Sequence, residues 1–158
     1  MPAANTNLDA CEQEPHDAFA SAEPAPVCAN SLLQQMHQVL GENGLLAQSS
    51  TSYRPRADQL QMAQAVTQAI ASNSAVVIEA GTGVGKTFAY LVPALLSGER
   101  IAISTATKNL QDQLFARDLP YLCQLLGLPL RMALLKGRGS YLCLHRLANA
   151  RQHPDVHG

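Results

Sequence analysis

A strand-like run that leads directly into a glycine-rich turn constrains this chain of 158 residues more than any other feature. The run Ala75–Ala80 is short, nearly all apolar and rich in β-branched residues, which is typical of a strand buried in a parallel sheet. The turn after it ends in Gly-Lys-Thr at residues 85–87, and an apolar stretch to Leu96 follows. The order of strand, glycine-rich turn and helix predicts a loop that cradles phosphate groups.

The residue types in this turn match the chemistry of phosphate binding. Its glycines let the backbone turn with N–H groups pointing inward, and the following helix directs the positive end of its dipole at the same anion. Lys86 supplies positive charge for the β- and γ-phosphates and Thr87 supplies a hydroxyl for Mg²⁺, so these two are the candidate catalytic residues. A glycine-rich turn with an exposed lysine is the alternative. We expect the whole turn to contact a nucleoside triphosphate: Gly81, Thr82, Gly83, Val84, Gly85, Lys86 and Thr87.

The first part of the chain has a different composition from the rest. Residues 1–30 hold eight Ala, four Pro and five acidic residues but no basic residue, which is typical of a disordered tail. Apolar residues from Leu32 to Leu40 then recur at helical spacing, with Ser31 as the expected N-cap and Gly41 as the stop. We therefore expect residues 31–52 to form a short helix and a linker.

Strand and helix patterns alternate along the remainder of the chain. A helix is expected from Pro55 to about Asn73, with Met62, Val66 and Ile70 on its apolar face. Further helices are expected after the glycine-rich turn, from about residue 108 with an interruption near Pro120, and over residues 141–150. Such alternation implies an α/β fold with a parallel sheet flanked by helices. The expected strands are residues 75–80, 100–105 and 130–135.

Composition excludes several classes of protein. The longest nearly apolar stretch, Phe88–Leu96, is much shorter than the roughly 20 residues of a membrane-spanning helix. A secretory signal requires basic residues near its start, but none precedes Arg54. The four cysteines have no short repeated spacing, so we expect a reducing compartment and no disulfide framework. Residues 54–158 hold all eleven basic residues and six acidic ones, which favours an anionic partner, although a solvated charged face gives the same pattern.

Four segments follow, in order and spacing, the motifs of one known family. They are Tyr53–Arg56 with Gln59 and Met62, Glu79–Thr87, Ser104–Leu114, and Lys136–Arg138 with Tyr141–Cys143. They resemble, respectively, the adenine-reading Q-like motif, motif I, motif Ia and the entry to the iron–sulfur domain of XPD/DinG-type superfamily 2 DNA helicases, most of all the bacterial YoaA/DinG group. The resemblance covers residues 53–148. It implies that residues 53–139 form the N-terminal part of a RecA-like ATP-binding domain and that residues 140–158 begin an iron–sulfur domain inserted into it.

The resemblance also implies roles for single residues. Gln59 would read the adenine through its amide, and Arg54 would lie against the base or ribose, which together imply ATP with Mg²⁺. A surface glutamine is the alternative for Gln59. Cys143 would be the first ligand of a [4Fe–4S] cluster, which needs four thiolates, whereas Cys123 lies in an apolar helix and is expected in the core.

Motif Ia implies a nucleic-acid partner. Thr105, Thr107 and Lys108 lie where a strand is expected to end and a helix to begin, which suits binding of a single-strand phosphate without reading sequence. A capped helix with an exposed lysine is the alternative. The implied partner is single-stranded or forked DNA, RNA is left open, no membrane is involved, and the implied location is the bacterial cytoplasm at the nucleoid.

No Asp-Glu-x-His motif follows the phosphate loop in this sequence. We therefore expect an N-terminal fragment of an iron–sulfur DNA helicase of DNA repair, which binds Mg-ATP weakly, lacks hydrolysis on its own and exposes strand edges. The longer parent would couple ATP hydrolysis to DNA unwinding. Two alternatives stay open: another phosphate-loop NTPase or kinase, and a non-catalytic remnant that binds nucleotide or DNA.

Overall fold

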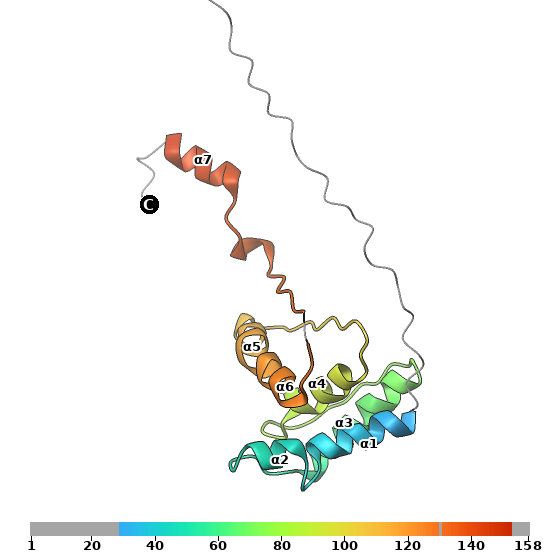
Figure 1. Cartoon of the computed structure of the whole chain (residues 1–158). Coiled ribbons are helices and arrows are strands. Elements are labelled where there is room, and N and C mark those ends of the chain that lie inside the picture. Colours follow the sequence, from blue (N-terminus) through green and yellow to red (C-terminus); the bar gives the residue numbers. More distant parts are fainter. Residues whose placement is uncertain (1–28, 130, 153–158) are drawn as a thin grey trace, which may run out of the picture.

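The computed structural model describes residues 29–129 and 131–152 (Figure 1). The expected tail lies outside these residues, except for its last two positions. Helical elements follow one another in this order: α1 (Ala29–Leu40), α2 (Leu45–Ser49), α3 (Ala57–Ala71), α4 (Lys86–Leu96), α5 (Lys108–Gln113), the π-helical turn η1 (Leu114–Asp118), α6 (Leu119–Leu126), the 3-10 turn η2 (Arg138–Ser140) and α7 (Leu144–Gln152).

The centre of the fold is helical. Helices α1, α3 and α4 all pack against one another, and α6 contacts both α2 and α4 (Figure 1). Each of α1, α2, α4 and α6 contributes a fully buried side chain to one apolar cluster, respectively Met36, Leu46, Leu91 and Leu122. Burying a side chain of this size contributes about 1.5–3 kcal/mol. The cluster therefore holds α4, the helix that follows the glycine-rich turn, in a fixed place.

Helix α1 confirms the periodicity of the sequence, but it begins earlier than expected. Its apolar positions from Leu32 to Leu40 supply the buried face. Ser31 is not the N-cap, because the helix already begins at Ala29 and the Ser31 hydroxyl instead accepts a bond from the Gln35 amide at 3.3 Å.

The expected linker contains a helix that the sequence analysis did not predict. Leu46, in α2, is 1% exposed and belongs to the central cluster. The α2 helix has only five residues, which is too short to show a clear helical period. Its burial against α1 and α6, rather than its own propensity, explains why it forms.

Helix α3 confirms the expected element but buries a different face. Its buried residues are Gln59, Ala63 and Thr67, whereas Met62 and Val66 of the expected apolar face are only partly buried. Small side chains at the helix contact let α3 approach α1 and α4 closely. The Thr67 hydroxyl donates to the Ala63 carbonyl at 2.7 Å, which satisfies it inside the core.

The two helical prolines behave differently. Helix α4 continues through Pro93, which is buried. Near Pro120 the expected interruption is present as the π-helical turn η1, which joins α5 to α6. Proline lacks the N–H that an α-helical turn uses, so a local change of hydrogen-bond register just before Pro120 is the physical result.

The expected parallel sheet is not formed among the residues that the structure describes. Residues 75–80, 100–105 and 131–135 have no strand assignment; residue 130 lies outside the described part. A strand exists only when its N–H and C=O groups pair with a neighbour. These segments carry the composition of strands, but no ladder joins them here.

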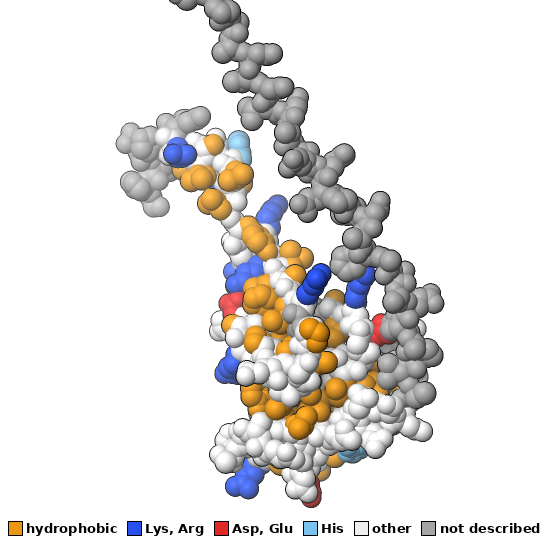
Figure 2. Space-filling view, viewed as in Figure 1, with side chains coloured by type: hydrophobic (Ala, Val, Ile, Leu, Met, Phe, Trp, Pro, Cys, Tyr) orange, Lys and Arg blue, Asp and Glu red, His pale blue; other side chains and the backbone are white. Residues whose placement is uncertain are grey.

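Apolar side chains on these segments face water, as the sequence analysis expected for unpaired strand edges. Val77 is 99% exposed and Leu135 is 83% exposed, and Val76, Ile101 and Ile103 are also exposed. Figure 2 shows hydrophobic side chains gathered over the visible face of the molecule. The segments that should form a sheet therefore carry much of the exposed apolar surface.

Helix α7 extends away from the central helices (Figure 1). It spans Leu144–Gln152 rather than the expected residues 141–150, and all its described side chains are exposed. Among the helices of the described residues, none combines the length and hydropathy that crossing a membrane requires.

Candidate nucleotide-binding site

The phosphate loop, residues 80–87, keeps two glycines in conformations that other residues rarely adopt. Gly83 has φ +82° and Gly85 has φ +87°, both in the left-handed region. Gly85 is also the N-cap of α4, which begins at Lys86. The free N–H groups and the positive dipole end of α4 therefore lie at the end of the loop, where an anion is stabilised.

Lys86 closes the loop on itself. Its Nζ donates to the carbonyl oxygen of Ala80 at 2.8 Å and to that of Gly81 at 2.7 Å. Both acceptors belong to the same loop, so the ammonium lies across its mouth. Thr87, the other candidate catalytic residue, is partly buried in the first turn of α4. Burial raises the pKa of nearby Tyr90, and a bond with the Thr87 hydroxyl partly opposes that rise.

Gln59 bridges α3 to the phosphate loop. Its side chain is 3% exposed. Its Nε2 donates to the Gly85 carbonyl at 3.0 Å, and its Oε1 accepts a bond from the Tyr53 hydroxyl at 2.7 Å. The structure thus brings the Q-like segment and motif I into direct contact.

The two arginines of the Q-like segment, Arg54 and Arg56, are both exposed. Arg56 directly precedes α3, and a Cβ added to Gly83 would lie 3.8 Å from Arg56 Nη1. The sequence prediction assigns a ligand contact to Arg54 and none to Arg56, although Arg56 is the arginine next to Gly83. A cavity of about 390 Å³ also separates α3 from the loop and is lined by Asp58, Met62, Ile78, Glu79, Gly81 and Val84, among others.

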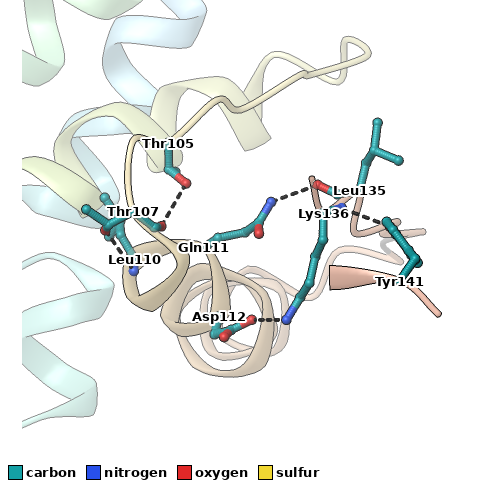
Figure 3. Close-up of polar contacts among 8 residues, drawn as sticks. All are labelled: Thr105, Thr107, Leu110, Gln111, Asp112, Leu135, Lys136 and Tyr141. Carbon is teal, nitrogen blue, oxygen red and sulfur yellow. Dashed lines mark hydrogen bonds and ion pairs between the residues drawn. The ribbon is translucent and has the colours of Figure 1, made fainter. Parts of the chain in front are cut away.

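The motif Ia residues surround the start of α5 (Figure 3). Thr107 is the N-cap of α5 and accepts a bond from the Leu110 N–H at 3.3 Å. The Thr105 hydroxyl donates to the Thr107 carbonyl, also at 3.3 Å. Lys108 is exposed. The arrangement presents a helix start and a lysine to solvent, and it also satisfies the capped-helix alternative.

The same helix is fastened to the segment that leads towards Cys143 (Figure 3). Gln111 Nε2 donates to the Leu135 carbonyl at 2.8 Å, and Asp112 forms an ion pair of 2.7 Å with Lys136. The Lys136 N–H donates to the Tyr141 hydroxyl at 2.9 Å. Sequence reasoning missed the first two contacts, because partners 24 residues apart leave no local pattern.

The described cysteines do not make a cluster site. Cys143 is exposed, and Cys123 is buried in α6 as expected. No group of three or more His, Cys, Asp or Glu suited to a metal ion occurs among the described residues. One exposed thiol cannot supply the four thiolates of a [4Fe–4S] cluster, so this part of the chain does not by itself fit that cofactor.

A second and larger cavity, of about 970 Å³, lies beside the motif Ia segment. Residues 99–108 and most of residues 131–137 line it together with side chains of α4, η1 and α6, including Leu91, Leu114 and Leu119. Its walls include two of the three segments expected to be strands. The cavity therefore marks the region in which the expected sheet is not formed.

Comparison with known proteins gives a consistent result. The family model for the DEAD/DEAH box helicase matches residues 57–154. The chain is 57% identical over 113 residues to the ATP-dependent DNA helicase YoaA of Haemophilus influenzae, covering 72% of this chain and 18% of that protein. It is 53% identical over 105 residues to the protein of the same name in Escherichia coli, covering 66% and 16%.

More distant relatives carry a different name. The 3'-5' exonuclease DinG of Bacillus subtilis is 34% identical over 119 residues, which cover 73% of this chain and 13% of that protein. The chain thus spans less than a fifth of the length of these relatives. No solved structure is significantly similar to it.

Proposed function

The chain belongs to the DEAD/DEAH box helicase family, and from this premise we propose that it binds Mg-ATP as the nucleotide-binding part of an ATP-dependent DNA helicase. The observation that carries the proposal is the phosphate loop. Gly83 and Gly85 adopt left-handed conformations where α4 begins, and Lys86 lies within the loop. The names of the relatives support ATP and DNA as the ligands.

The loop residues 81–87 would hold the triphosphate through backbone N–H groups. Lys86 would exchange its bonds to the Ala80 and Gly81 carbonyls for bonds to phosphate oxygens, which are stronger because both partners are charged. Thr87 would offer its hydroxyl to Mg²⁺, which neutralises charge on the phosphates when bound. The Mg²⁺ site therefore rests on one protein ligand, together with the phosphates.

The adenosine side of the site rests on the Q-like segment. Arg54 and Gln59 are proposed to contact the base or ribose. Arg56 is added because its guanidinium lies beside Gly83, within reach of the loop that holds the phosphates. Comparing Arg54→Ala with Arg56→Ala separates the two roles, since loss of a phosphate contact weakens ATP and inorganic triphosphate alike.

Thr105, Thr107 and Lys108 are proposed to bind the phosphate backbone of single-stranded or forked DNA. A contact of this kind is sequence-independent and weakens as salt rises. In a protein as long as the relatives, ATP hydrolysis would drive DNA unwinding in the bacterial cytoplasm at the nucleoid. Cys143 would there be one of four cluster thiolates, the other three coming from outside the described residues.

We also propose that the 158-residue chain does not hydrolyse ATP. Hydrolysis in phosphate-loop enzymes requires an acidic residue that holds Mg²⁺. The proposal rests on the sequence, in which no Asp-Glu-x-His motif follows the phosphate loop. The two acidic residues that line the cavity beside the loop, Asp58 and Glu79, precede the loop in the chain.

Titration of the chain with a fluorescent ATP analogue, with and without single-stranded DNA, tests this function. We expect Lys86→Ala to weaken binding by about tenfold or more, because charge-assisted bonds contribute about 1.5–3 kcal/mol. Lys136→Ala is the control, since that lysine pairs with Asp112 outside the phosphate loop. Equal affinity of the Lys86 variant would refute the nucleotide site. If adding single-stranded DNA leaves the affinity for ATP unchanged, another phosphate-loop enzyme such as a kinase is favoured. If the chain binds DNA with an affinity that does not depend on ATP, a non-catalytic remnant is favoured.

A further inference from the structure

Two part-buried hydrogen bonds link Tyr53, through the Gln59 amide, to the Gly85 carbonyl at the start of α4. We propose that Tyr53 is a positioning residue for the phosphate loop: its hydroxyl fixes the orientation of the Gln59 amide, which in turn holds the Gly85 carbonyl. The inference rests on the proposed nucleotide binding at residues 81–87. It gives Tyr53 a role of its own beside the adenine contact proposed for Gln59.

The polarity of this connection is fixed at its far end. The Gly85 carbonyl can only accept, so the Gln59 amide must turn its Nε2 towards it, at 3.0 Å. The Gln59 Oε1 must then face Tyr53, whose hydroxyl has to donate, at 2.7 Å. Because Gln59 is 3% exposed, water is not available to replace either partner. The Gly85 carbonyl therefore sets which way round the amide lies, and the Tyr53 hydroxyl holds the Oε1 end of the amide in that orientation.

The other end of the connection is anchored in the core. The Tyr53 side chain packs against the central apolar cluster, and its hydroxyl lies 3.4 Å from the carbonyl of Leu40, the last residue of α1. Burial also raises the pKa of Tyr53, an effect that the positive charge of Arg56 partly opposes. The phenol stays protonated at neutral pH, so the donor that the geometry requires is present.

Gly85 is the residue through which this connection can act on an anion. Its carbonyl accepts both from Gln59 Nε2 and from the Ala89 N–H, at 3.2 Å, which is the first bond of α4. Two donors fix the Gly85–Lys86 peptide, and with it the direction in which the neighbouring N–H groups point. A Cβ on Gly85 would clash with the Gln59 amide, so the amide also occupies the space above the glycine.

The positioning role uses only part of the hydrogen-bonding capacity of the Gln59 amide. A glutamine amide has two N–H donors and two acceptor lone pairs. The structure engages one N–H with Gly85 and one lone pair with Tyr53. A change at Tyr53 should therefore affect every ligand that uses the phosphate loop, whichever base it carries.

The test compares three ligands with the full chain: Mg-ATP, Mg-GTP and Mg-tripolyphosphate, which has no base. We expect Tyr53→Phe to weaken all three by one common factor of about tenfold. Tyr121→Phe is the matched control, since its hydroxyl bonds to Ser49 at 2.8 Å on the surface, and it should change none of the three. A changed ATP-to-GTP ratio with unchanged tripolyphosphate affinity would overturn the proposal.

A double-mutant cycle separates positioning from general loss of packing. If Tyr53 acts through Gln59, adding Tyr53→Phe to Gln59→Leu should cause no further loss of affinity. If the loss of affinity in the double variant is instead the product of the two single losses, the proposal is overturned. Should Tyr53→Phe fail to fold, Gln59→Leu alone must still weaken Mg-tripolyphosphate, the ligand that has no base.

A nucleotide-free readout keeps this inference distinct from the proposed function. In an NMR spectrum of the chain without ligand, Tyr53→Phe should shift the Gly85 and Lys86 backbone amide signals, and Tyr121→Phe should not. If the wild-type chain binds none of the three ligands, the proposed function fails, while this shift still supports the positioning role of Tyr53. Unchanged Gly85 and Lys86 signals would overturn that role even in a chain that binds ATP.

Discussion

Lys86 and Ala80 close the phosphate loop across its width, with Nζ of the lysine 2.8 Å from the alanine carbonyl oxygen. The same ammonium bonds Gly81 at 2.7 Å. An anion that enters the loop competes with two neutral acceptors for a charged donor. A phosphate oxygen is expected to be the stronger acceptor, because it brings a negative charge to the ammonium whereas the two carbonyls are neutral.

The closed loop leads to a prediction for the ligand-free chain. Lys86→Ala removes both bonds across the loop, so the amides of residues 80–85 should exchange their hydrogens faster without nucleotide. Hydrogen–deuterium exchange read by mass spectrometry measures this. Lys136→Ala, which breaks only the ion pair with Asp112, should leave that peptide unchanged. Identical exchange in wild type and Lys86→Ala would show that the lysine does not hold the loop.

A methyl group at Gly85 should destabilise the fold more than one at Gly98. Both glycines have positive φ, at +87° and +71° respectively, which costs about 1–2 kcal/mol for alanine. Gly98 has open space at its Cβ position, but at Gly85 the methyl group would also clash with Gln59. Overpacking adds about 1–3 kcal/mol. Urea unfolding of both alanine variants gives the difference, and equal losses would contradict it.

Leu122 should be among the most sensitive positions of the core. It is 0% exposed in the cluster that joins α6 to α4 and α2. Leu122→Ala is expected to lower the free energy of unfolding by about 2–5 kcal/mol. Leu135→Ala removes the same atoms from a side chain that is 83% exposed, so its effect should stay within about 0.5 kcal/mol. The same denaturant titration compares the two, and a similar loss in both would refute the assignment of the core.

Stability should fall in alkaline solution. Burial raises the pKa of Cys123 above its ordinary 9.0 and those of Tyr53 and Tyr90 above 10.0. Each group favours its neutral form more strongly in the folded chain, so its contribution is fully present below the unfolded pKa. That contribution is lost as the pH rises through the folded pKa. Denaturation curves at increasing pH measure the decline, and a free energy of unfolding that is constant above pH 10 would contradict it.

The two described cysteines should differ in reactivity. Cys143 is exposed, whereas Cys123 is buried and its pKa is raised by that burial, which lowers its thiolate fraction. A maleimide reagent should modify Cys143 first and Cys123 only as the chain unfolds. Peptide mapping after timed labelling distinguishes the two sites. Equal rates in the native chain would show that α6 does not shield its cysteine.

The sequence predicts the elements whose signals are local. The helical period predicted α1 and α3, and the glycine-rich turn predicted a helix from about Gly85, one residue before the observed start of α4 at Lys86. Ser31 was wrong as a cap, because a serine inside a helix has the same sequence context as one that precedes it. The short α2 was missed, since only the packing of Leu46 reveals it.

Features that depend on distant partners could not be predicted. The run Ala75–Ala80 has strand composition, but strand formation needs a neighbour to pair with, and no ladder forms in the described residues. The contact of Gln59 with Gly85 spans 26 residues of sequence. The resemblance to the family motifs indicated that Gln59 and Gly85 belong to one site. It did not indicate that the Tyr53 hydroxyl would bond to Gln59.

The run Ala75–Ala80, which carries Val77, also affects the tendency of the chain to self-associate in solution. Its side chain is 99% exposed, and β-branched segments with unpaired backbone are the raw material of cross-β stacking between copies. Glu79 is the one charged residue within the run, and a charge in such a segment opposes stacking between copies. Association between copies of the chain is therefore expected to increase with protein concentration. Dilution should reduce this association. Cooling should reduce it too, because hydrophobic association weakens at lower temperature.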